Sequence, residues 1–204
     1  RSHPDSSFAD DAMLEAARIL EEELGEPARA LARYRALLDR FPDSRVARRA
    51  RARVEFLSGH LDAGEKALNA YHRILDQSTT RPVDESLSRM RALLERHPAF
   101  SLAPRALNWM ASLLVREGRL DEARALLHRL VREHPRDPAA GQAWTLLGRL
   151  AIERGDLDAA ERALTAMGRV PGGEWAAAST EALGRVERLR WQRRVRVGSV
   201  VAWA

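Results

Sequence analysis

The sequence contains no cysteine, and aromatic residues make up only 5% of its 204 residues. Without cysteine the chain can form neither a disulfide bond nor a thiolate nucleophile, although this absence is compatible with both reducing and oxidising compartments. Lys66 is the only lysine among the 34 basic residues. Alanine, leucine and arginine dominate instead, and these residues carry small helix penalties. The composition therefore favours helix.

The motifs of catalysis and metal binding are also missing. The chain has no Gly-rich phosphate loop and no nucleophile elbow. Its six histidines are scattered, without the i, i+4 spacing of a zinc-binding helix. Asp156 and Asp158 do not continue into the alternating ligands of a calcium loop. We therefore predict a protein that is not an enzyme and that uses no cofactor and no metal.

Positive charge is concentrated at the C-terminal end. Residues 185–204 contain six arginines and one acidic residue, Glu187, so this segment carries the same net charge of +5 as the whole chain. Residues 1–184 are balanced, with 28 basic and 28 acidic side chains. The body of the protein thus offers no net-charge argument for binding nucleic acid or an anionic surface.

The sequence repeats itself with a period near 38 residues. Pro4-Asp5-Ser6 returns as Pro42-Asp43-Ser44, a shift of 38, and His97-Pro98 returns as His134-Pro135, a shift of 37. A repeat of this length accommodates two helices and their turns, and stacked helix pairs form a solenoid. Solenoids usually provide binding surfaces.

Glycine and proline separate amphipathic stretches with helical periodicity, and no stretch shows sustained strand alternation. The fold class that we predict is all-α. The expected helices lie at about residues 8–24, 27–40, 44–58, 62–77, 84–97, 102–117, 120–133, 139–154, 157–168 and 174–195.

The spacing of the repeats predicts the organisation of the chain. We expect the following segments in order: two N-terminal helix pairs at 1–77, a loop with an unpaired helix at 78–100, two well-formed repeats at 101–171, a capping helix with an Arg-rich end at 172–196 and an apolar tail at 197–204. Solenoids need such a capping element at an open end.

Two stretches resemble the tetratricopeptide repeat (TPR) family in the spacing of their apolar and small residues. In 104–135 these residues are Leu107, Met110, Ala111, Leu114, Gly118, Ala123, Leu127 and Pro135. In 141–171 they are Trp144, Leu147, Gly148, Ala151, Gly155, Ala160 and Leu164. The resemblance implies a right-handed superhelix of helical hairpins, an α-solenoid, with Gly118 and Gly155 in tight turns and Trp144 buried between helices.

The resemblance also implies a non-catalytic scaffold that binds another protein or peptide through the inner helices. The positions that line the concave groove of TPR proteins correspond here to Arg105, Asn108, Ser112, Arg116, Gln142, Thr145, Arg149 and Glu153. A second interpretation stays open, in which the chain is a regulatory or sensory module fused to a membrane or catalytic domain.

The C-terminal end suggests membrane association. The basic residues Arg188, Arg190, Arg193, Arg194 and Arg196 precede the uncharged stretch Val197–Ala204. This stretch is either the start of a truncated membrane span or a frayed tail, since a span needs about 20 apolar residues. Binding of this segment to anionic lipid is a third interpretation, and nucleic acid is disfavoured because the apolar stretch explains the arginines more simply.

The lengthened first repeat is similar to bacterial cell-envelope TPR proteins of the Tol–Pal-associated and barrel-assembly lipoprotein types, and this resemblance implies the periplasm. A real span after Arg196 would instead keep the arginines on the cytoplasmic face. We expect the chain, which opens at Arg1, to be part of a larger membrane-associated bacterial protein.

Overall fold

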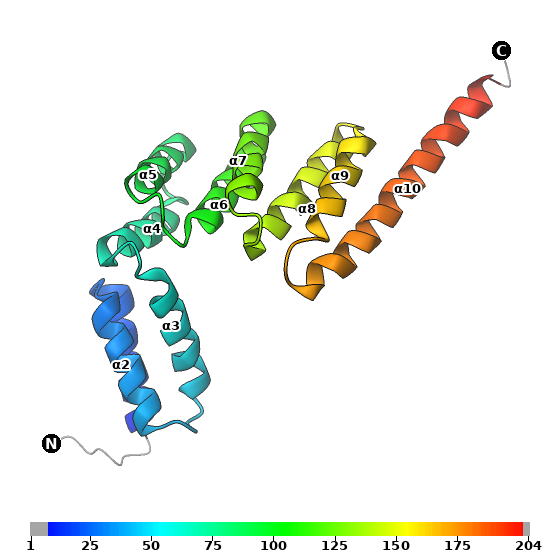
Figure 1. Ribbon diagram of the computed structural model, residues 1–204. Coiled ribbons are helices and arrows are strands. Elements are labelled where there is room, and N and C mark those ends of the chain that lie inside the picture. The colour runs from blue at the N-terminus through cyan, green and yellow to red at the C-terminus, as the bar shows by residue number, and fades with distance from the viewer. Residues whose placement is uncertain (1–7, 202–204) are drawn as a thin grey trace. The chain divides into compact units, whose positions relative to one another are not determined.

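The computed structural model describes residues 8–201, with side chains described through residue 195. Within this range the chain is all-α, without a β-strand, and the predicted TPR-like solenoid fold is confirmed. The elements are α1 (Ala9–Arg18), the π-helical turn η1 (Ile19–Glu23), α2 (Pro27–Arg40), α3 (Ala47–His60), α4 (Glu65–Gln77), α5 (Val83–Arg96), α6 (Ala103–Arg116), α7 (Leu120–Glu133), α8 (Pro138–Glu153), α9 (Leu157–Met167) and α10 (Gly173–Val201). Figure 1 shows the order of these helices.

The turns follow from local chemistry. Gly118 and Gly155 have φ values of 72° and 74°, a left-handed conformation that glycine adopts without steric cost. Asp137 caps α8 by accepting a hydrogen bond from the backbone nitrogen of Ala139 at 2.8 Å. Asp156 caps α9 by accepting from the backbone nitrogen of Ala159 at 2.9 Å. These caps satisfy backbone donors that have no partner inside the helix.

The chain divides into two compact units, Arg1–Ala103 and Pro104–Ala204. In the first unit α1 packs against α2, α2 against α3, and α4 against α5. The core side chains of this unit are almost fully buried, among them Tyr34, Leu37, Leu57, Leu87, Met90 and Phe100.

In the second unit α7 packs against α8, α8 against α9 and α9 against α10. Small residues allow the close approach of α8 and α9: a β-carbon on Gly148 would lie 2.9 Å from Cδ2 of Leu164, and Ala160 is fully buried. Trp144 packs against the core cluster around Ala160 and is partly buried. Its indole lines a surface cavity and therefore keeps contact with solvent.

Helix α10 starts within one residue of the expected capping helix and runs further, to Val201. Its inner face is held to α9 by Val186, which is 1% exposed, and by Ser179, whose hydroxyl donates to the carbonyl oxygen of Leu164 at 2.7 Å. Across residues 8–201, no helix combines the length and the apolar content that crossing a membrane requires. Residues 202–204 of the apolar tail and the side chain of Arg196 lie outside the described part of the chain.

Candidate functional site

The second unit has a groove along the middle turns of α6 and α8. It encloses about 410 Å³ and is lined by Asn108, Ser112, Gln142, Thr145, Leu146, Arg149 and Trp175. Five of these residues belong to the eight that the sequence predicted for an inner-helix groove. The structure thus places polar groups from two successive hairpins, together with an indole from α10, on one surface.

The polar groups of this groove are ordered by hydrogen bonds. The amide nitrogen of Asn108 donates to Oε1 of Gln142 at 2.7 Å and so connects α6 to α8. The hydroxyls of Ser112 and Thr145 each donate to a backbone carbonyl oxygen of their own helix, at 2.9 Å in both cases. The guanidinium of Arg149 lies 3.8 Å from the Glu153 carboxylate, and both side chains are more than half exposed. Arg149 therefore keeps donors for another group.

Three predicted groove residues do not line this groove. Arg105 stands near the start of α6, Arg116 at its last residue and Glu153 at the last residue of α8. The groove follows the middle turns of these helices, so side chains at the helix ends fall outside it.

Two residues of the groove, Leu146 and Trp175, were not predicted from the sequence, and Trp175 is the one that comes from another helix. A β-carbon on Gly141 would lie 2.2 Å from Cε2 of its indole, so the ring occupies space that only glycine leaves free on α8. The indole nitrogen is buried and has no hydrogen-bond partner among the described residues. The available signal was a glycine inside an otherwise regular helix, which often marks a close approach.

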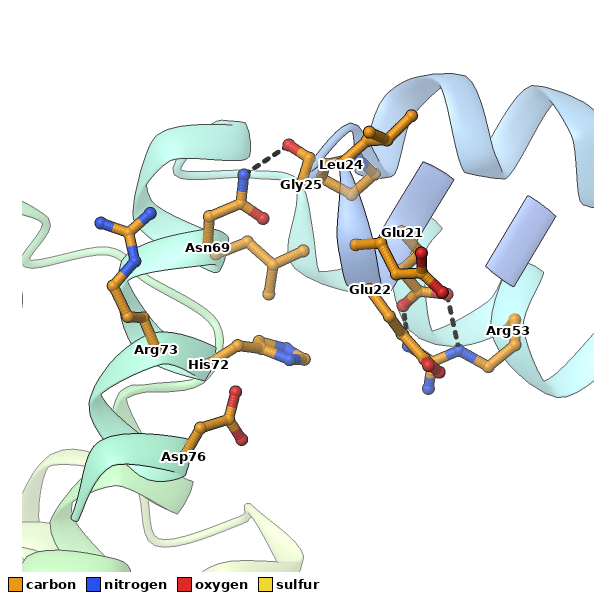
Figure 2. A pocket seen from close by; sticks show the side chains of 12 residues that line it. Glu21, Glu22, Leu24, Gly25, Arg53, Asn69, His72, Arg73 and Asp76 are labelled. Atoms are coloured by element: carbon orange, nitrogen blue, oxygen red, sulfur yellow. Dashed lines mark hydrogen bonds and ion pairs between the residues drawn. The ribbon is translucent and has the colours of Figure 1, made fainter. Parts of the chain in front are cut away.

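The first unit contains a larger cavity of about 750 Å³, shown in Figure 2. One side is formed by η1 and the turn after it, and the other sides by α3 and α4. Its lining residues are Glu21, Glu22, Glu23, Leu24, Gly25, Pro27, Arg53, Leu68, Asn69, His72, Arg73 and Asp76. The amide nitrogen of Asn69 donates to the carbonyl oxygen of Gly25 at 2.6 Å and fixes the turn against α4.

An ion pair between Glu21 and Arg53 lies in the wall of this cavity. The Glu21 side chain is only 9% exposed, and its Oε2 also accepts a hydrogen bond from the Tyr34 hydroxyl at 3.1 Å. Burial, followed by the negative charge of Glu21, raises the pKa of Tyr34 well above its ordinary value. Burial lowers the pKa of His72, because desolvation disfavours the charged imidazole. Nε2 of His72 is buried without a hydrogen-bond partner among the described residues.

The arginines near the C-terminal end of α10 fall into two groups. Arg190 bonds to Glu161 at 2.6 Å and to Asp158, while Arg193 donates to the carbonyl oxygen of Gly155 at 3.2 Å. These two arginines therefore hold α10 against the N-terminal part of α9 and the turn before it. Arg188 and Arg194 lie on either side of Trp191, which is 62% exposed, at a surface depression of about 610 Å³ that Arg190 also lines. Arg194 also lines a second depression, beside Asp156 and Asp158.

Comparison with known proteins shows that parts of this chain are similar to repeat families. Two family models match, both described as tetratricopeptide repeat: one covers residues 80–138 and 110–174, and the other covers residues 11–44. No curated protein matches the chain. One similar solved structure is a protein from Bacteroides ovatus ATCC 8483 whose proposed role is protein binding. Its TM-score is 0.44 at 16% identity, and the match covers 90% of this chain and 98% of that one.

Proposed function

The chain belongs to the tetratricopeptide repeat superfamily and is a protein-interaction scaffold; from this premise we propose that the groove between α6 and α8 captures an extended segment of a partner protein. The observation that carries the proposal is the convergence of Asn108, Gln142 and Arg149 with the Trp175 indole in one groove. TPR families are typically non-catalytic interaction modules, and the groove contains no nucleophile with an adjacent base.

The groove chemistry suits a peptide backbone with an occasional apolar side chain. A side-chain amide has two donors and one acceptor oxygen, so the bonded pair of Asn108 and Gln142 keeps both a donor and an acceptor for a further group. A peptide unit presents the complementary N–H and C=O. Trp175 and Leu146 form the apolar part of the groove wall, and Arg149 adds a positive charge.

The test compares groove variants with a matched control on the same helix. Once a partner has been identified by cross-linking, its affinity should fall at least tenfold for the double variant Asn108→Ala with Gln142→Ala. Arg105→Ala, also on α6 but outside the groove, should leave the affinity within about twofold. Equal affinities for the groove variant and the unmodified protein would show that the partner binds to another surface.

We further propose that the outer face of α10 associates with an anionic membrane surface. The supporting observation is Trp191, exposed between Arg188 and Arg194, because tryptophan and arginine together favour the membrane interface. Fusion to a membrane-bound domain would bring this face near the bilayer. The arginines then favour the cytoplasmic side if a span follows, and the resemblance to envelope proteins favours the periplasm.

Vesicle co-sedimentation tests this association. The chain should bind vesicles rich in phosphatidylserine and not those of phosphatidylcholine alone, and Arg188→Ala with Arg194→Ala should weaken binding by about 1 kcal/mol per arginine. The control is Arg169→Ala, an exposed arginine outside α10. Tighter, strongly salt-dependent association with nucleic acid would contradict the membrane assignment.

A further inference from the structure

The second unit has another surface cavity, on the face of α8 opposite the groove. It encloses about 570 Å³ and is lined by residues of α7, α8, α9 and the turn before α9, all different from those of the groove. Trp144, which lines the cavity, and Gln142, which lines the groove, are two residues apart on α8. Two residues turn an α-helix by about 200°, so the two sites open in different directions. The cavity is therefore a separate site from the groove of the proposed function.

Apolar side chains form one part of the cavity wall. They are Trp144, Leu147, Ala151, Ala159 and Ala163. Leu147 and Ala163 are buried, whereas the larger indole of Trp144 is only partly buried. Aromatic side chains contribute strongly to protein interfaces because they bury much apolar surface. The partly open indole of Trp144 therefore offers an apolar contact to a side chain of a ligand.

The polar part of the wall carries an excess of positive charge. Among the residues that the structure describes, three guanidinium groups line the cavity, from Arg124, Arg154 and Arg162, against one carboxylate, from Asp156. That carboxylate already accepts the hydrogen bond from the backbone nitrogen of Ala159 that caps α9. The charges at the cavity are therefore mainly positive.

The nearby carboxylate of Asp121 does not neutralise these arginines. Its Oδ1 bonds Arg154 at 2.6 Å and also bonds Arg124, so one carboxylate serves two guanidinium groups. The pKa of Asp121 is lowered from its ordinary value, first by the hydrogen bond from Arg154 and then by the charge of that arginine. A guanidinium has five N–H donors, so both arginines keep donors for a further acceptor. Arg162 is exposed and forms no ion pair or hydrogen bond within the described part of the chain.

From this arrangement we propose that the cavity binds an acidic segment of a partner protein, in which an apolar side chain lies next to aspartate or glutamate. The apolar side chain packs on the Trp144 indole, and the carboxylates bond the guanidinium groups of Arg154 and Arg162. Charge complementarity selects this occupant, because a basic segment would face three guanidinium groups and bring no acceptor charge for them. A phosphate or phosphodiester group would bond the arginines but would leave the apolar wall uncovered.

The experiment uses the full chain and follows the indole N–H resonance of Trp144 by NMR, assigned through its absence in Trp144→Phe. The probes are the capped tripeptides Ac-Asp-Leu-Asp-amide, Ac-Asn-Leu-Asn-amide and Ac-Asp-Gly-Asp-amide, and inorganic phosphate. The Asp-Leu-Asp peptide should cause a saturable shift with a dissociation constant on the order of millimolar. The second peptide keeps the shape without the charge, the third keeps the charge without the apolar side chain, and both should bind more weakly. Higher salt should weaken the binding, because exposed charges are screened.

Variants decide which groups form the site. Arg154→Gln and Arg162→Gln should each weaken binding of the Asp-Leu-Asp peptide by about threefold, the size expected for an exposed ion pair. Arg162→Lys, which keeps the charge, should weaken it less. The matched control is Arg132→Gln, since Arg132 lies on α7, is 72% exposed and does not line the cavity, and its loss should not change the affinity.

Four outcomes overturn the proposal. Absence of saturation with the Asp-Leu-Asp peptide shows that the cavity does not bind it. Equal binding of the Asn-Leu-Asn peptide shows that charge has no role, and an equal saturable shift with inorganic phosphate assigns the arginines to phosphate ligands. Loss of binding in Arg149→Gln, with full binding in Arg162→Gln, places the peptide in the groove.

Discussion

The indole of Trp175 rests on the backbone of α8 at Gly141, where a β-carbon would lie 2.2 Å from Cε2 of the ring. Trp175 stands near the start of α10, so this contact fixes where the terminal helix meets the preceding repeat. The same ring forms one wall of the groove of α6 and α8. Docking of the capping helix and the shape of the proposed binding surface therefore depend on one contact.

Gly141→Ala should destabilise the second unit. Alanine is better than glycine in a helix by about 1 kcal/mol, but the clash with Trp175 forces the indole to move, and overpacking of this kind costs about 1–3 kcal/mol. We expect a net loss of stability in urea denaturation and faster amide hydrogen exchange at the start of α10. Combining Gly141→Ala with Trp175→Ala should cost less than the sum of the two single changes, because one contact is lost in both. Additive losses would contradict the contact.

The helices could be predicted from the sequence because the signals that define them are local. Glycine and proline separate the amphipathic stretches, and nine of the ten predicted ranges begin or end within one residue of an observed helix boundary at one end or both. Gly118 and Gly155 were expected in turns and do adopt positive φ. Five groove residues could be predicted because the TPR pattern fixes which helix face lines the groove.

The contacts that join distant positions could not be predicted in this way. Trp175 and Gly141 are far apart in the sequence. A glycine inside a helix indicates a close approach, but it does not identify the residue that approaches. In the sequence His72 is one of six scattered histidines, and its position in a cavity lined by η1, α3 and α4 is visible only in the structure. The partial exposure of Trp144 likewise depends on how far α7 and α9 cover α8, which helical periodicity does not encode.

Ala160 and Trp144 should differ in how much stability they provide. Ala160 is fully buried, so Ala160→Arg introduces both excess volume and an unpaired buried charge and should unfold the second unit. Trp144 is only partly buried, so Trp144→Ala should cost about 3 kcal/mol or less, at or below the low end for a buried tryptophan. The measurement is the melting temperature of each variant and of the unmodified protein, followed by circular dichroism. A larger loss for Trp144→Ala would contradict the observed packing.

Acidification should weaken the first unit through His72. Burial holds the pKa of His72 below its ordinary value, so the unfolded chain takes up a proton that the folded chain resists. The negative charges of Glu21 and Asp76 oppose this shift and the charge of Arg53 adds to it, but burial dominates. The free energy of unfolding should therefore fall as the pH decreases from about 6.5, the pKa of an unperturbed histidine.

The measurement is urea denaturation at pH 7.5 and 5.5. The loss of stability between the two should be smaller in His72→Gln than in the unmodified protein, because glutamine does not titrate. His128→Gln, which changes an exposed histidine, is the control and should keep the full loss. Identical pH dependence in all three proteins would show that His72 is not the group responsible.

The arginines of α10 should separate into those that hold the helix and those that serve an external surface. Arg190 bonds both Asp158 and Glu161, and the first of its contacts, the hydrogen bond to Glu161, raises the pKa of the guanidinium. Arg190→Ala should therefore speed amide exchange in α10 beyond Val186, although the loss of global stability should be small, as for surface ion pairs. Arg194→Ala, about one turn of helix away, should leave this exchange unchanged and reduce only vesicle binding. Equal exchange rates in the two variants would mean that the ion pairs with α9 do not order the end of α10.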